Sequence, residues 1–199
     1  AVLVGGVAEI LPSILSVPEQ VAASSNVPYT ALELEGRDVY LREGCYTCHS
    51  QMIRPLRDEV ERYGHYSLAA ESMYDRPFQW GSKRTGPDLA RDGGKSSDAW
   101  QNAHLQNPRD LVPESIMPPY KFLAERDLAL EEIQAYLAAN KKLGVPYTDE
   151  MVELAISDLK TQLDEYADDE DGFRARYPKA TLRDFDGNPD RITEMDAMV

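Results

Sequence analysis

The stretch EGCYTCHSQM, residues 43–52, contains both cysteines of a 199-residue chain. Cys45 and Cys48 are two residues apart, and His49 follows directly, which completes the pattern C-x-x-C-H. Three kinds of chemistry use a pair of thiols in this spacing: a redox-active dithiol, half of a zinc site, and the attachment point of a c-type haem. The rest of the sequence favours one of them.

The zinc and dithiol interpretations lack the residues that they need. A structural zinc site needs four ligands, usually two cysteine pairs or one pair with two spaced histidines. Only His65 and His104 remain, and a histidine directly after Cys48 is poorly placed to close a tetrahedron with both thiolates. A thioredoxin-like dithiol needs a βαβ unit and a helix that starts after the first cysteine, whereas here the predicted helix precedes the motif.

The haem interpretation uses all three reactive side chains of the motif. Two thiols on neighbouring turns add across the two vinyl groups, and the same turn brings a histidine to the iron. The sequence therefore predicts one covalent haem c, attached to Cys45 and Cys48, with His49 as an axial ligand. With no third cysteine, the chain has no thiol that could mispair in an oxidising compartment.

The second axial ligand is expected to be a methionine or a histidine, as in other electron-carrying haems. Met117 is the favoured candidate because the proline-rich loop around it is stiff; the alternative is a methionine that fills space beneath the loop. His65 is the second candidate ligand. Met52 is too close to His49 in the chain, and Met73 has no distinctive context. The other methionines lie on predicted helices, where methionine usually fills the core.

Two further features surround the motif. A metal-bound histidine needs an acceptor for its other ring N–H, and the Pro87 carbonyl, in a rigid turn, is predicted to accept this bond from His49. Residues 50–95 carry 8 basic and 7 acidic residues, although the whole chain has a net charge of −14. This arginine-rich stretch suggests that an anionic group is held nearby, although any single arginine can be an ordinary surface charge. The candidates for contacts with the haem propionates or a partner are Arg54, Arg57, Lys83 and Arg84.

The fold is predicted to be all-α with long loops, because no alternating β pattern is present. Helical periodicity predicts helices over Leu34–Gly44, Glu125–Leu143 and Asp149–Tyr166. The acidic run DDEDG, residues 168–172, is expected to end the last of these. Thr193 and Asp196 predict the capped start of a further helix. Small and aromatic residues on one face of the first helix, Gly36, Tyr40 and Gly44, are expected to let another helix cross closely.

The net charge and the apolar N-terminal residues limit the class of protein and its expected domains. The net charge of −14 argues against nucleic-acid binding. Residues 1–12 are expected to be the end of a transmembrane helix, because AVLVGGVAEIL is apolar apart from Glu9 but shorter than the roughly 20 residues that cross a bilayer; the alternative is a short buried segment. Residues 13–33 are interpreted as a linker and residues 34–199 as the haem domain. An acidic insertion is predicted at about 144–192, and the last helix is expected to be truncated.

Several long stretches resemble the membrane-anchored mono-haem cytochrome c subunit of cbb-type (C-family) haem-copper oxidases. They are EGRDVYLREGCYTCHSQMIRPLRDEVERYGHYS (35–67), FQWGSKRTGPDLAR (78–91), HLQNPRDLVPESIMPPYKFL (104–123), LGVPYTDE (143–150) and TEMDAMV (193–199). A generic class I cytochrome would share only C-x-x-C-H, G-P-D-L and the methionine loop. The acidic segment 164–190 matches the family less well, and no function is carried onto it.

The resemblance implies a class I cytochrome c fold after one N-terminal transmembrane helix, on the periplasmic side of the bacterial inner membrane, with haem ligated by His49 and Met117. It implies electron transfer from a di-haem cytochrome c subunit or a soluble cytochrome c to haem b of the haem-copper catalytic subunit, which reduces oxygen and pumps protons. The subunit itself would have no catalytic side chain. Alternatives are the mono-haem subunit of another membrane reductase, such as nitric oxide reductase, and a haem-based gas sensor or peroxidase with an open sixth position.

Overall fold

The computed structural model describes residues 3–12, 26–75, 77–81, 83–164 and 166–199. In these ranges the regular structure is helical, and the isolated bridge between extended segments joins Asp127 to Thr193. The prediction of an all-α fold is confirmed for this part of the chain. Of the predicted linker 13–33, residues 13–25 lie outside the described residues.

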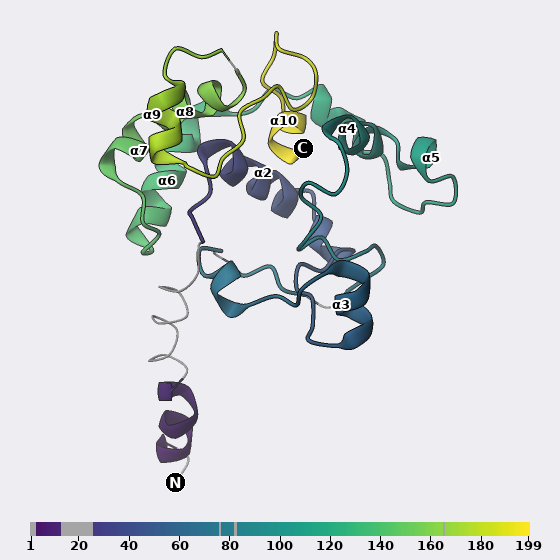
Figure 1. Ribbon diagram of the computed structural model, residues 1–199, viewed down its shortest axis with the longest axis vertical. Helices are drawn as coiled ribbons and strands as arrows, with labels where there is room; N and C mark the ends of the chain where they lie inside the picture. Colours follow the sequence, from purple (N-terminus) through teal and green to yellow (C-terminus); the bar gives the residue numbers. More distant parts are fainter. Residues whose placement is uncertain (1–2, 13–25, 76, 82, 165) are drawn as a thin grey trace.

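Helix α2, Ala31–Arg42, lies at the centre of the domain (Figure 1). Figure 1 places α6 to α9 on one side of α2, with α4 and α5 on the other. The other helices are α3 (Arg57–Tyr63), α4 (Asp98–Gln106), α5 (Pro108–Leu111), α6 (Ile133–Lys142), α7 (Asp149–Glu153), α8 (Ala155–Gln162), α9 (Glu170–Arg176) and α10 (Glu194–Met198). Short 3-10 turns occupy Cys45–Thr47, Ala69–Ser72, Lys121–Ala124 and Leu130–Glu132.

The start of α2 is set by a capping box. The Thr30 hydroxyl accepts a bond from the backbone N–H of Glu33 at 3.2 Å, and the Glu33 carboxylate accepts one from the Thr30 N–H at 2.8 Å. Because both orphan donors are satisfied at Thr30, the helix begins at Ala31 and not at the predicted Leu34. The predicted linker is therefore shorter at this end.

Helices α2 and α10 cross at Gly36. A Cβ atom at this position would lie 1.8 Å from the carbonyl oxygen of Ala197, so no larger residue fits. This confirms the close crossing that the small and aromatic stripe predicts. The start of α10 is also confirmed, because Thr193 caps it and the Asp196 carboxylate accepts from the Thr193 N–H at 2.8 Å.

Two of the predicted helices are interrupted in the structure, and the prediction that the acidic run 168–172 ends a helix is wrong. Leu130–Glu132 is a 3-10 turn, so the helix expected from Glu125 begins only at Ile133. The helix expected over Asp149–Tyr166 divides at Leu154 into α7 and α8. The acidic run at 168–172 starts α9 instead of ending a helix, because Glu170 and Asp171 stand in its first turn, where the helix dipole favours negative charge.

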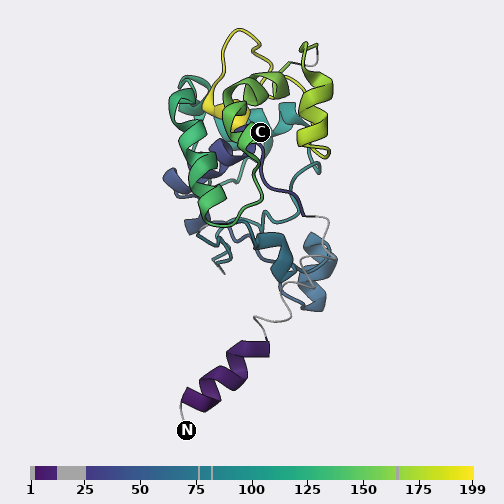
Figure 2. The same ribbon diagram turned by 90° about the vertical axis from the view of Figure 1, so that its left-hand side faces the viewer.

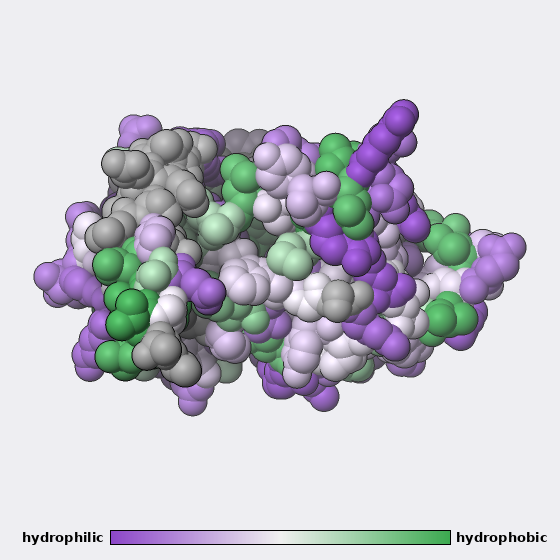
Figure 3. All heavy atoms as spheres, turned by 90° about the horizontal axis from the view of Figure 1, so that it is seen from below, coloured by the Kyte–Doolittle hydropathy of each residue, from purple (hydrophilic) through white to green (hydrophobic). Residues whose placement is uncertain are grey.

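The N-terminal residues 3–12 form a helix that lies apart from the rest of the described chain (Figure 2). Its apolar side chains are exposed: Leu3 is 82% and Val4 is 71% accessible to solvent. Seen from below, apolar side chains gather on this helix at one end of the molecule and near α5 at the other (Figure 3). No helix in the described part of the chain is long and apolar enough to cross a membrane.

Candidate functional site

The C-x-x-C-H motif forms one tight turn directly after α2. Gly44 adopts a left-handed conformation with φ of +73°, which lets the chain reverse into the 3-10 turn Cys45–Thr47. The carbonyl of Cys45 accepts bonds from the backbone N–H groups of Cys48 and His49 at 3.1 and 2.9 Å. Both cysteines are free thiols, and burial raises the pKa of the Cys45 thiol to about 11. The turn therefore presents two free thiols and one imidazole together.

The ring of His49 is held by the turn that contains Gly86 and Pro87. His49 Nδ1 lies 2.8 Å from the Pro87 carbonyl oxygen, the contact that the sequence predicts. The ring packs so closely on Gly86 that a Cβ there would lie 2.2 Å from His49 Cε1. The Gly86 N–H in turn donates to the Cys48 carbonyl at 3.0 Å. A hydrogen bond at Nδ1 leaves Nε2 as the ring nitrogen that can bind a metal.

Asp88 fixes this turn to the chain that follows the motif. Its carboxylate is 2% exposed and accepts bonds from the Ser50 hydroxyl at 2.6 Å, the Met52 N–H at 3.0 Å and the Ala90 N–H at 2.9 Å. The backbone adds a bond from the Leu89 N–H to the Ser50 carbonyl at 2.9 Å. A buried carboxylate with this many donors holds the two segments in one arrangement.

Arg84 and Glu59 extend this network. The Arg84 guanidinium donates to the Ser50 hydroxyl at 2.7 Å, to the Met52 carbonyl at 3.0 Å and to the Glu59 carboxylate at 2.7 Å. These bonds from Arg84, followed by those from Arg54, hold the pKa of Glu59 at about 2. Arg84 also lies over the ring of Tyr63, 5.1 Å from its centroid.

The four predicted cationic candidates differ in their ion pairs and in their exposure to solvent. Arg54 and Arg84 meet at the buried carboxylate of Glu59, so both are paired within the chain. Arg57 has a 90% exposed side chain and pairs with Glu61 one turn along α3, and Lys83 is exposed. Of the four, only Arg84 is largely enclosed, with an 18% exposed side chain; Arg54 is 50% exposed although it pairs with Glu59.

Met117 lies half-buried in the loop between α5 and the turn Lys121–Ala124, and its N–H donates to the Ser115 hydroxyl at 3.2 Å. The loop returns to α4 where the Tyr120 N–H donates to the Leu105 carbonyl at 2.7 Å. The neighbouring Ile116 is 74% exposed. The loop is thus fixed at both ends while its tip is open to solvent.

His65 and Met195 have local roles that differ from a ligand's. His65 is exposed, stacks on Tyr66 with ring centroids 4.2 Å apart, and has its Nδ1 atom 2.7 Å from the Tyr66 carbonyl oxygen. Met195 is fully buried and packs with Val39 and Leu123, as expected of a methionine on a helix.

Three polar aromatic residues beside the motif were not predicted as site residues. Tyr40 is buried, its hydroxyl has no partner among the described residues, and burial followed by the nearby Cys45 raises its pKa. Burial and both cysteines raise the pKa of Tyr120. Burial, and then the charge of His49, lower the pKa of His104. For His104 and Tyr120, the distance in the sequence from the motif concealed this grouping.

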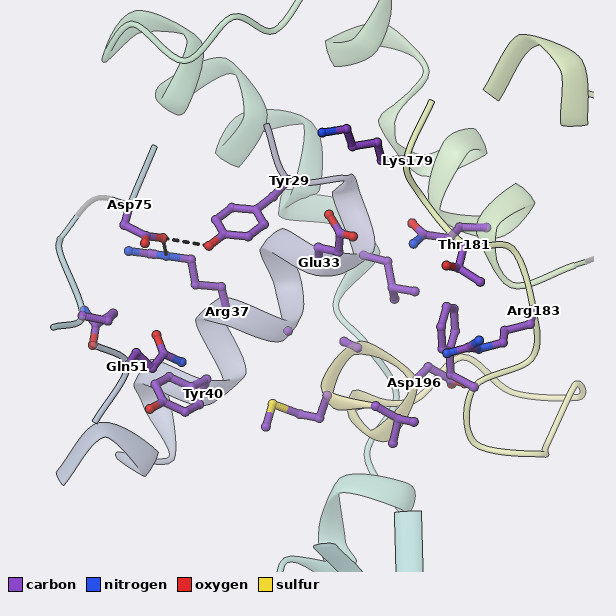
Figure 4. A pocket seen from close by; sticks show the side chains of 18 residues that line it. Tyr29, Glu33, Arg37, Tyr40, Gln51, Asp75, Lys179, Thr181, Arg183 and Asp196 are labelled. Atoms are coloured by element: carbon purple, nitrogen blue, oxygen red, sulfur yellow. Dashed lines mark hydrogen bonds and ion pairs between the residues drawn. The ribbon is translucent and has the colours of Figure 1, made fainter. Parts of the chain in front are cut away.

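A separate polar cleft of about 370 Å³ lies between α2, the C-terminal helix and residues 179–185 (Figure 4). On one side of it, the Tyr29 hydroxyl and Arg37 Nε both donate to Asp75, at 3.0 and 3.1 Å (Figure 4). On the other side, Arg183 pairs with Asp98 at 2.6 Å. Because these cations are neutralised within the chain, they give the cleft no excess positive charge for an anion.

Among the described residues, one group of carboxylates has a geometry that could hold a metal ion. The ligand oxygens of Asp184, Asp186 and Asp196 lie within 4.8 Å of one another. They already accept bonds from backbone N–H groups of their own loop, including Gly187 to Asp184 and Asn188 to Asp186, both at 2.8 Å. These hydrogen bonds therefore account for the clustering of the carboxylates.

The chain matches the model of a known protein family. A family model described as cytochrome c oxidase, mono-heme subunit/FixO, matches residues 1–199. A search of curated proteins finds no match to the chain.

Proposed function

Because the chain belongs to the FixO family of mono-haem cytochrome c oxidase subunits, we propose that it binds one haem c covalently and passes electrons to the catalytic subunit of the oxidase. The family resemblance seen in the sequence is confirmed, and it makes the chain a component of an oxidoreductase complex. The match is to an oxidase family, so the comparison gives no support to a nitric oxide reductase subunit.

The observation that carries the proposal is the setting of His49. Its ring is clamped between the Gly86 backbone and the Pro87 carbonyl, with Nδ1 occupied, directly after two free thiols. The Tyr40 hydroxyl and His104 Nδ1 have no partner among the described residues, and the electrostatic effects of Cys45 on Tyr40 and of His49 on His104 place them near the motif, so both fit a group that supplies hydrogen-bonding atoms. The residues present therefore fit a haem.

Each residue of the site has a defined task in this proposal. Cys45 and Cys48 add their S–H groups across the vinyl C=C bonds of the haem, sulfur to one carbon and hydrogen to the other, with no oxidant required. His49 Nε2 and the Met117 sulfur bind the iron, and Pro87 holds the ring of His49 in the ligating orientation. Haem iron supplies a one-electron couple, and methionine ligation raises its potential.

The proposed setting is a class I cytochrome c domain on the periplasmic side of the bacterial inner membrane. The exposed apolar side chains of residues 3–12 support attachment to a membrane through an N-terminal helix. The electron donor is a di-haem cytochrome c subunit or a soluble cytochrome c, and the acceptor is haem b of the haem-copper subunit. Arg57 and Lys83 are proposed to face a partner. Arg54 and Arg84 are paired with Glu59, so either one could bind a propionate only while it also retains this ion pair.

The test is to purify the whole oxidase and measure covalent haem on the denatured subunit, together with the haem types and copper of the complex. Haem that stays on the chain, and is lost in Cys48→Ala, supports the proposal. A wild-type chain without covalent haem contradicts it.

A second variant tests the sixth ligand. Met117→Ala is expected to change the visible spectrum of the ferric haem and to let the reduced haem c bind carbon monoxide, because one axial position becomes open. Met195→Ala is the control, since this methionine is fully buried in the core. An unchanged spectrum in Met117→Ala would exclude this residue as the ligand and would reopen the gas-sensor alternative.

A further inference from the structure

His104 on α4 has an unexplained buried nitrogen. Its ring stacks on that of Trp100, one helical turn earlier, with centroids 4.6 Å apart and an interplanar angle of 9°. Its Nδ1 atom is buried and has no hydrogen-bond partner among the described residues. A buried polar atom without a partner costs about 1–3 kcal/mol. The ring is therefore held in place, while no described residue supplies a partner for its nitrogen.

Two observations place His104 near the predicted iron ligands. The bond from the Tyr120 N–H to the carbonyl of Leu105, the residue after His104, joins the end of the Met117 loop to α4 at 2.7 Å. The charge of His49 contributes to the lowered pKa of His104, which indicates that the two imidazoles are neighbours. His104 thus lies near His49, at the point where the Met117 loop rejoins α4.

We infer that His104 donates a hydrogen bond from Nδ1 to the haem unit, to a propionate oxygen or to the Met117 sulfur, and thereby raises the reduction potential. This inference rests on the proposed function. Ferric haem carries one more positive charge than ferrous haem, and the positive end of an N–H dipole directed at it disfavours the ferric form. Trp100 fixes the direction of this dipole through the ring stack.

The test compares two histidine variants in the purified, assembled oxidase. His104→Phe keeps a ring that can stack on Trp100 but removes the donor. His65→Phe is the matched control, because His65 is exposed and its Nδ1 already has a partner in Tyr66. The measurement is the midpoint potential of haem c by redox titration.

The expected result is a fall in the equilibrium constant for reduction of at least about threefold in His104→Phe, which is about 28 mV at 59 mV per tenfold change. The His65→Phe variant is expected to keep the wild-type potential. His104→Gln is expected to recover part of the loss, because its amide also donates a hydrogen bond.

The spectrum identifies the acceptor. If the methionine-to-ferric-iron charge-transfer band shifts together with the potential, the acceptor is the Met117 sulfur; a shifted potential with an unchanged band points to a propionate. An unchanged potential in His104→Phe, with covalent haem still present, overturns this inference and leaves the proposed function intact. A wild-type chain that carries no covalent haem is the separate failure of the proposed function.

If the variants fail to assemble, a structure of the wild-type complex with haem bound provides an independent test. His104 Nδ1 within hydrogen-bonding distance of a haem oxygen or the Met117 sulfur supports the inference. Nδ1 bonded to another protein group overturns it.

Discussion

The haem-side loops, residues 44–123, and the helical lobe, α6 to α9, are held together by different forces. In the lobe, Ile133, Leu137, Leu159 and Phe173 are each fully buried in one apolar core. Around the motif, the buried groups that join separate segments are polar, chiefly Asp88 and Glu59. The loops contain many glycines and prolines, and few of their large apolar side chains are buried, so directed hydrogen bonds largely replace apolar packing there.

This difference predicts two kinds of sensitivity. Apolar packing is spread over many contacts, and losing one side chain lowers stability without moving a particular group. Hydrogen bonds are directional, and a buried acceptor that loses its donors allows the attached loop to move. Changes in the lobe are therefore expected to affect mainly unfolding, and changes in the haem-side loops mainly the ligand geometry.

The largest effect on stability is expected in the lobe. Phe173→Ala removes a fully buried ring that packs 5.3 Å from Tyr177 and is expected to lower the free energy of unfolding by about 3–5 kcal/mol. Denaturant titration of the haem-loaded chain measures this. The haem spectrum of the folded fraction should match wild type, and a changed spectrum would break the comparison.

In the haem-side loops, Asp88→Asn is expected to lower the free energy of unfolding by about 1–3 kcal/mol. The amide keeps the shape but brings an N–H group toward donors from Ser50 and the Met52 and Ala90 backbone. The same titration measures it, with the exposed Asp58→Asn as control. In contrast to Phe173→Ala, its haem spectrum should change; an unchanged spectrum would mean that the network does not position the ligand.

Gly86→Ala tests the clamp on the imidazole. The added methyl would stand 2.2 Å from His49 Cε1, and overpacking of this kind costs typically about 1–3 kcal/mol. We expect displacement of the His49 ring, seen as less haem attached per chain or a changed ferric spectrum. Gly93→Ala is the control, because a Cβ there meets no atom within 4 Å. Equal haem content and spectra in both variants would refute the clamp.

The smaller effects are expected in the pH dependence of the free energy of unfolding. The pKa of Glu59 is about 2 in the folded protein, below the value of about 4.3 expected when unfolded. A lowered carboxyl pKa adds stability that is present above the unfolded pKa and is lost as the pH falls toward 2. Unfolding measured between pH 5 and pH 2 should therefore show a steeper loss in wild type than in Glu59→Gln. Parallel curves would contradict the Arg84–Glu59 pairing.

The raised pKa of Glu35 on α2 predicts the opposite dependence. Burial, and then neighbouring carboxylates, raise it to about 7. A carboxyl group raised in the folded state costs stability above pH 7, and this cost disappears as the pH falls toward the unfolded value. Glu35→Gln should therefore stabilise the chain at pH 8 more than at pH 5, as the same titration at the two pH values would show. A gain that does not depend on pH would contradict the raised pKa.

Local features of the sequence predicted local structure well. The cap of α10 was predicted from Thr193 and Asp196 because both halves of a capping box lie within four residues. The acidic run at 168–172 was misjudged, because the buried Phe173 stabilises α9 through a tertiary contact. The helix divisions at Leu130–Glu132 and Leu154 leave no clear signal in periodicity.

Two thiols and an imidazole within five residues, together with long family-specific stretches, were enough to predict a covalent haem and the family, because such patterns can be recognised without knowledge of the fold. How these groups are positioned depends on tertiary contacts. The Pro87 carbonyl lies 38 residues from His49, and Arg84 lies 25 residues from Glu59. The loop that supplies each of these hydrogen-bond partners is brought into place by the tertiary fold, and patterns between nearby residues in the sequence do not predict such long-range contacts. For this reason Arg84 emerged as an internal anchor and His104 as a neighbour of His49 only in the folded chain.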